Sequence, residues 1–132
     1  DFREPTAPPP QPATADPTLD SRIATARDAL KQATTAFGEG AIRAERLTRA
    51  ASGAAAGSDA WLDAQTALAD LDAARARQVD VLTDLEQLAS DRAMTLAPPY
   101  PALDQAVTEA QGAADASATR IAALQRGLAP AT

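Results

Sequence analysis

Apolar residues recur at alternating steps of four and three along two stretches of this chain. The first stretch keeps this rhythm from residue 19 to residue 51: Leu19, Ile23, Ala26, Leu30, Ala33, Phe37, Gly40, Ala44, Leu47 and Ala51. The second repeats it from residue 103 to residue 128: Leu103, Val107, Ala110, Ala114, Ser117, Ile121, Leu124 and Leu128. Such spacing places one narrow apolar stripe along a helix, which is typical of helices packed lengthwise on one another.

Between these stretches, the apolar residues follow a third helical pattern that covers a wider arc and indicates contacts on two sides. Helix-start signals precede each segment: Asp16-Pro17, Ser58-Asp59 and Pro101. Gly53 and the proline-rich stretch 97–101 end the first two. The predicted helices cover residues 17–52, 59–96 and 101–128.

Short turns between long helices predict antiparallel neighbours. The expected fold is therefore all-α, an up-down-up three-helix bundle over residues 17–129 with the middle helix in the centre. Reflecting the chain about its two turns places Gly40 level with about Asp72, and Leu128 level with about Leu71. In this register the third helix stops short of the first turn, so the tip there is expected to be a bare two-helix hairpin.

Gly38 and Gly40 lie inside the first predicted helix. Each glycine costs a helix interior roughly 1 kcal/mol relative to alanine, so a structural reason is expected. A kink is one such reason. The close approach of a neighbouring helix at Gly40, which falls on the apolar stripe, is the other.

The predicted tip carries the only tryptophan, Trp61. We interpret Trp61 either as a capping core residue or as an anchor for a partner or a second copy, since tryptophan is enriched at interface hot spots. In the second interpretation, the apolar tip surface is the binding site. Its candidate residues are Trp61, Leu47, Ala51, Ala60 and Ala64.

Arg75 and Gln78 interrupt the apolar positions of the middle helix at mid-height. Arg75 either lays its stem over the core with its head in water, or it forms with Gln78 a polar layer that sets the register of the bundle.

The amino-acid composition argues against several kinds of catalytic and metal-binding site. Alanine makes up about a quarter of the 132 residues, while histidine and cysteine are absent. This removes the commonest general base and the usual transition-metal ligands, so we expect no enzyme, cofactor or metal site. The carboxylates Asp28, Asp80, Asp84 and Asp115 are interpreted as a solvated face rather than a cation site. A net charge of −6 argues against nucleic acid as a partner, and no apolar run is long enough to span a membrane.

Residues 1–16 contain five prolines, and we expect them to form a flexible tether. Because the sequence starts at Asp1, we expect a signal peptide, a lipidated cysteine or a membrane anchor upstream. The eleven-to-one excess of arginine over lysine, with the alanine content, is typical of a high-GC bacterium. The functional hypothesis is a non-enzymatic scaffold or accessory module of an exported, periplasmic or envelope-associated bacterial protein. The alternative is an extracytoplasmic sensor or small-ligand-binding domain.

Overall fold

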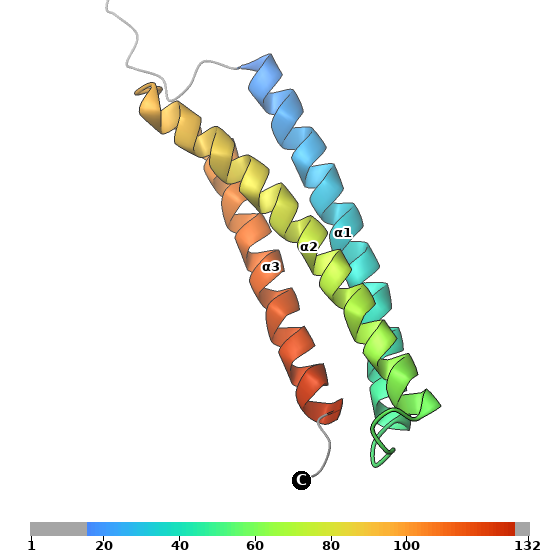
Figure 1. Cartoon of the computed structure of the whole chain (residues 1–132). Coiled ribbons are helices and arrows are strands. Elements are labelled where there is room, and N and C mark those ends of the chain that lie inside the picture. The colour runs from blue at the N-terminus through green and yellow to red at the C-terminus, as the bar shows by residue number, and fades with distance from the viewer. Residues whose placement is uncertain (1–15, 129–132) are drawn as a thin grey trace, which may run out of the picture.

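The computed structural model describes residues 16–128, which fold into three helices and contain no strand (Figure 1). Helix α1 spans Pro17–Ala50, α2 spans Asp59–Met94 and α3 spans Pro101–Leu128. All three pairs of helices are in contact, and α2 packs along both of its neighbours. The predicted up-down-up three-helix bundle is confirmed. The predicted tether at residues 1–16 lies outside the described residues except for Asp16.

The predicted start signals cap the helices. The Asp16 carboxylate accepts a hydrogen bond from the Leu19 amide at 3.0 Å, and the Ser58 hydroxyl accepts one from the Trp61 amide at 3.4 Å. These caps satisfy amide groups that the first helical turn leaves free. Gly53 and Gly57 adopt positive φ angles of 79° and 85° in the turn between α1 and α2, a conformation that glycine reaches without strain.

Two helix ends differ from the prediction by two residues each. Helix α1 ends at Ala50, and α2 ends at Met94, so Leu96 lies outside the helix. The Leu96 amide donates to the Ala93 carbonyl at 3.2 Å, and the Ala97 amide donates to the Arg92 carbonyl at 3.0 Å. These bonds form a Schellman motif, whose left-handed position is occupied here by Leu96 with φ of 56° instead of the usual glycine.

The register between α1 and α2 agrees with the prediction. A Cβ atom added to Gly40 would lie 3.0 Å from Leu71 Cδ2, and the Gln78 side chain bonds to Thr34. Of the two reasons considered for the glycines, Gly40 shows close helix approach. Nothing lies within 4 Å of a Cβ added to Gly38, where no neighbour demands glycine.

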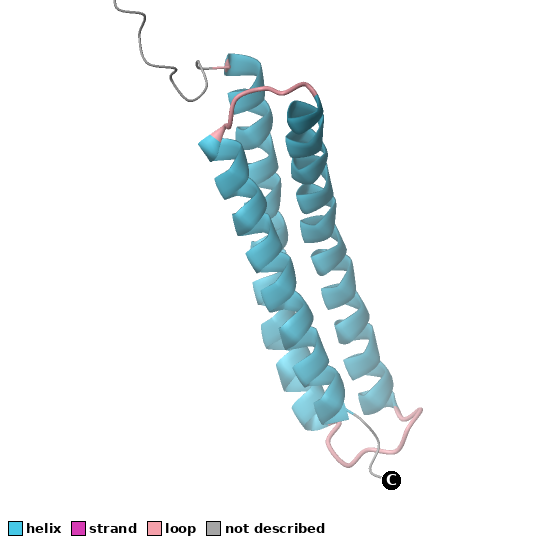
Figure 2. Ribbon diagram, turned by 90° about the vertical axis from the view of Figure 1, so that its left-hand side faces the viewer, coloured by secondary structure: helices cyan, strands magenta, loops and turns pink. Residues whose placement is uncertain are grey.

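The register between α2 and α3 was predicted wrongly. Arg75 on α2 bonds to the Ala114 carbonyl on α3, whereas the reflected chain would place Ala114 near Leu85. Helix α3 thus lies about ten residues, or roughly 15 Å, closer to the α1–α2 turn than expected. The physical reason is the connection 95–100. Its prolines favour extended backbone, which runs back along the bundle before α3 begins (Figure 2).

This shift decides which end of the bundle is closed. The tip is defined here as the end of α1, the turn 51–58 and the first turns of α2, and α3 reaches it with Ile121 and Leu128. The open end is defined as the first turns of α1 and residues 84–96 of α2. There α2 extends past the start of α3 (Figure 2).

The core divides into two clusters along the bundle. The tip cluster is built mainly from alanine, with Phe37, Leu68, Leu71, Ile121 and Leu128 as its large side chains. The open-end cluster contains Leu19, Ile23, Val81, Leu82, Leu85, Tyr100 and Leu103. On the surface, Arg27 pairs with Glu109 at 3.4 Å and Arg120 pairs with Glu45 at 3.1 Å. Exposed pairs of this kind contribute only about 0–1 kcal/mol, so apolar packing holds α3 in place.

Candidate functional site

The predicted partner surface at the tip is not an open apolar patch. Ala51 and Ala64 are buried, while Leu47, Ala60 and Trp61 are half-buried and pack against the tip cluster. The premise of a bare hairpin is wrong because α3 covers the faces of α1 and α2 that the predicted register left open. The Trp61 indole nitrogen is buried and has no hydrogen-bond partner. This geometry favours the interpretation of Trp61 as a capping core residue.

Arg75 and Gln78 lie between the two core clusters. Gln78 is only 1% exposed, and its side-chain nitrogen donates to the Thr34 hydroxyl at 3.2 Å, while its Oε1 atom has no partner. Arg75 is half-buried, and its Nε donates to the Ala114 carbonyl at 3.1 Å. Gln78 thus links α2 to α1, and Arg75 links α2 to α3. This is the arrangement that a register-setting polar layer requires.

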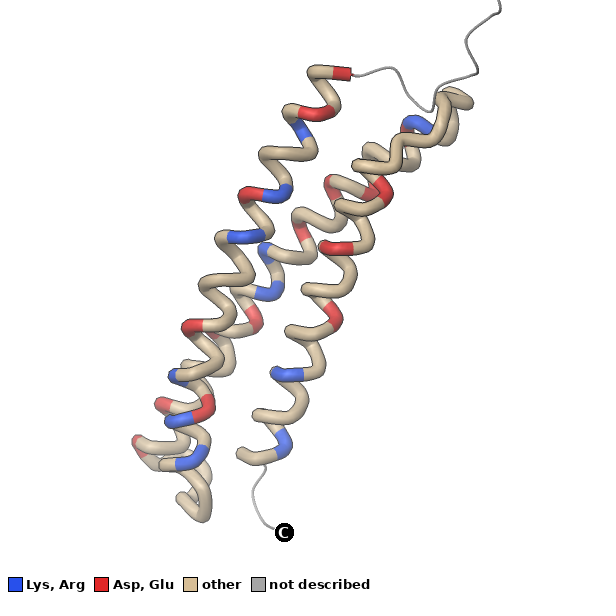
Figure 3. Tube along the Cα trace, turned by 180° about the vertical axis from the view of Figure 1, so that it is seen from behind, with Lys and Arg blue, Asp and Glu red and all other residues tan. Residues whose placement is uncertain are grey.

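The carboxylates do not form a cation site in the part of the chain that the structure describes. No group of three or more acidic side chains comes together between residues 16 and 128. Acidic and basic positions are instead interspersed along the helices (Figure 3). Over the same residues, no helix is long and apolar enough to cross a membrane.

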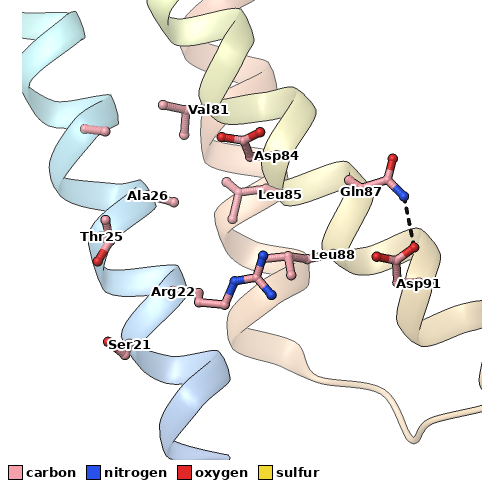
Figure 4. Close-up of a pocket in the computed structure, with 11 residues that line it drawn as sticks. Ser21, Arg22, Thr25, Ala26, Val81, Asp84, Leu85, Gln87, Leu88 and Asp91 are labelled. Atoms are coloured by element: carbon pink, nitrogen blue, oxygen red, sulfur yellow. Dashed lines mark hydrogen bonds between the residues drawn. The ribbon is translucent and has the colours of Figure 1, made fainter.

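A hollow in the surface forms a groove between α1 and α2 near the open end, which the sequence analysis did not identify. It has a volume of about 460 Å³. In Figure 4, α1 contributes Arg22, Thr25 and Ala26 to one wall, and α2 contributes Leu85, Leu88 and Asp91 to the other. The floor is apolar, because Leu85 is buried and Ala26 and Leu88 are half-buried. The rims are polar.

Two smaller hollows extend this groove in both directions. One shares Arg22, Leu88 and Asp91 with it and continues to Asp16 and Thr95 at the outer end. The other shares Ala29, Val81 and Asp84 and continues to Ala33 and Arg77. Along α1 the full groove runs from Asp16 to Ala33, or roughly 26 Å at 1.5 Å per residue. We call this feature the α1/α2 groove.

Two large apolar side chains stand in water beside the outer end of the groove. Met94 is 81% exposed and Leu96 is 91% exposed, and Thr95 between them lines the groove. The sequence analysis included Leu96 as the last residue of the predicted helix 59–96. It missed this exposure because the tight turn after Met94, rather than the prolines, determines where the helix stops.

Tyr100 ties the α2–α3 connection to the start of α1. Its hydroxyl donates to the Asp20 carboxylate and accepts a hydrogen bond from the Asp16 amide at 3.5 Å. The Arg92 guanidinium lies over the ring, 5.2 Å from its centroid. The hydrogen bond to Asp20, followed by burial, raises the pKa of Tyr100 above its ordinary value of about 10. The hydrogen bonds of Tyr100 thus hold the α2–α3 connection against the start of α1 at the open end.

Comparison of this chain with protein-family models, with curated proteins and with solved structures gives no match.

Proposed function

We propose that this chain is a non-enzymatic helical interaction module, which presents the open end of its bundle to a protein partner within a larger assembly. The observation that carries the proposal is the exposure of two large apolar residues close together in the sequence, Met94 at the end of α2 and Leu96 in the turn that follows it. Neighbouring apolar side chains that remain in water tend to mark interaction surfaces. The adjoining groove extends this surface down the bundle.

The backbone at Leu96 supports the same proposal. A left-handed conformation at a residue other than glycine costs roughly 1–2 kcal/mol, and the exposed Leu96 side chain recovers little of it within the monomer. Local strain without a stabilising contact is often retained at functional sites. Contact with a partner would give the Leu96 side chain the apolar surroundings that the monomer lacks.

We place this module in the bacterial envelope, as a scaffold or accessory subunit exported from the cytoplasm and held by the proline-rich segment 1–16. The support for this location is the composition of the sequence. Fractionation of cells that make the protein with a C-terminal tag should recover it with the periplasm or the envelope. Recovery in the cytosolic fraction would contradict the proposed location.

The alternative, a small-ligand or sensor domain, draws its support from the groove. A volume of about 460 Å³ falls in the range of roughly 300–1,000 Å³ that is usual for small-molecule sites. The groove is open along its length, however, and its deepest residues are apolar, so few polar groups converge on a ligand. We therefore favour a macromolecular partner.

Site-specific photo-crosslinking in the cells that make the protein tests the interaction module. A photoreactive amino acid at position 94 should give a discrete band above the mass of the monomer. The matched control is position 42, since Ile42 is also a largely exposed apolar residue on a helix. Equal crosslinking at both positions, or none at position 94, would overturn the proposal.

A further inference from the structure

Polar side chains separate the two apolar clusters at mid-height of the bundle. The polar layer is defined here as Arg75 and Gln78 of α2 together with Thr34 of α1, which are linked by the hydrogen bonds described above. The buried alanines at the same height, Ala33 on α1 and Ala114 on α3, belong to neither cluster. Two long polar side chains on α2 therefore lie at the height of small residues on both neighbouring helices.

The polar layer stabilises the bundle less than an apolar layer would. Gln78 is 1% exposed, yet its Oε1 atom accepts no hydrogen bond. Removing a polar atom from water without giving it a partner is unfavourable, and an apolar side chain of similar size would avoid that penalty. Arg75 is half-buried and uses its Nε to reach a carbonyl within α3. A cost in stability of this kind calls for a gain in another property.

That property is the register of α3, because the apolar stripe of this helix permits more than one. The stripe repeats at steps of four and three, so a slip of seven residues returns the same face to α2. A slip toward the open end would put Ile121 in the place of Ala114, and a slip toward the tip would put Val107 there. The slip toward the open end would also shorten the path of the connection 95–100.

We infer that the polar layer holds α3 in the observed register and excludes the slip toward the open end. In the slipped register, the branched Ile121 side chain would meet Arg75 and Gln78, so buried polar groups would lie against apolar atoms without partners. The observed register instead gives Arg75 a carbonyl of α3. The connection 95–100 limits how far α3 can move, and the polar layer selects one position within that range. The same layer keeps the open end uncovered, whatever binds there.

Spin labels on two introduced cysteines measure the register directly, because the sequence contains no cysteine of its own. Asp63→Cys on α2 and Thr108→Cys on α3 are exposed positions far apart along the bundle. A slip of seven residues toward the open end would lengthen the distance between the labels by roughly 10 Å, at 1.5 Å per residue. Double electron–electron resonance on the full chain with an unaltered layer should give a single distance.

The layer variant Arg75→Met, Gln78→Leu makes the layer apolar with little change in volume. It should add a second distance, longer by roughly 10 Å. It should also raise the melting temperature by about 3 °C or more, because the unpaired acceptor is gone. The matched control Arg77→Met, Gln65→Leu makes the same substitutions at exposed positions of α2 and should keep the single distance.

Tyr100→Phe separates the polar layer from the anchored connection, which is the other contact that restrains α3. This variant removes the hydrogen bonds between the tyrosine hydroxyl and residues 16 and 20. If the polar layer holds the register, Tyr100→Phe keeps the single distance. Circular dichroism melts establish that each variant is folded. If the layer variant is not, the single variant Arg75→Met decides the question by the same distance measurement.

A single, unchanged distance in the layer variant would overturn the inference. So would a second distance in the surface control or in Tyr100→Phe alone, because the register would then depend on general surface changes or on the connection. A melting temperature of the layer variant below that of the unaltered chain would also overturn it, since the layer would then be explained by stability.

Discussion

The two ends of this bundle are built from the same two helices, yet only one of them is closed. At the tip, the small residues Gly40, Ala44 and Ala64 let α1 and α2 pack closely, and Leu128 of α3 covers them. At the open end, α3 begins too late to cover α2, and α1 diverges from it. The comparison shows that a connecting loop decides which surface of a helical bundle is free. The six residues 95–100 shift α3 toward the tip and leave the opposite end exposed.

The largest contrast between the ends should appear on removing a leucine side chain. Leu71 is completely buried in the tip cluster, so Leu71→Ala should lower the free energy of unfolding by roughly 2–5 kcal/mol. Leu88 is half-buried on the groove floor, and Leu88→Ala should cost less than about 1.5 kcal/mol. Urea unfolding measures both. Similar losses at the two positions would mean that the groove is occupied or closed in solution.

The two glycines of α1 test the close approach of the helices. Gly38→Ala should stabilise the protein by about 1 kcal/mol, because alanine favours a helix and its methyl group meets nothing within 4 Å. Gly40→Ala gains the same propensity but presses on the buried Leu71. It should therefore be destabilising by roughly 1 kcal/mol relative to the unaltered chain. Equal stabilisation by both would show that Leu71 can move aside.

The turn after α2 holds Leu96 in a left-handed conformation, so placing a glycine there should stabilise the protein. Leu96→Gly relieves a left-handed backbone while removing a side chain that makes little contact, so it should raise stability by about 0.5–1 kcal/mol. Thermal melts measure this change. The same variant should reduce crosslinking to a partner. A loss of stability would show that the Leu96 side chain packs on its own chain.

The smallest effect is expected from Tyr100 at alkaline pH. Its pKa is raised in the folded protein, so the tyrosine binds its proton more tightly folded than unfolded. The stability this contributes is present below pH about 10 and is lost as the pH rises through the folded pKa. Tyr100→Phe should lack this alkaline loss. Hydrogen exchange at high pH should increase at the open end before the tip in the unaltered chain. Simultaneous exchange at both ends would contradict the assigned role of Tyr100.

The sequence alone predicted the helices and the contact between the first two of them. The alternating steps of four and three, the caps at Asp16 and Ser58 and the turn glycines act within a few residues, so local patterns predict them well. The short turn 51–58 nearly reverses the chain, and the predicted register of Gly40 against about Asp72 is close to the observed contact with Leu71. Asp16 and Ser58 both accept the hydrogen bonds expected of helix caps.

Only the tertiary structure decided where α3 lies and, with it, which surfaces are free. The prolines of the second connection indicated where helices could not continue, but they did not indicate how far an extended loop would run back along the bundle. Tyr100 anchors that loop to Asp20, about 80 residues away in the chain, and no local pattern encodes such a contact. The closed tip, the α1/α2 groove and the exposed Leu96 all depend on this placement, because a free surface is what remains after every helix has packed.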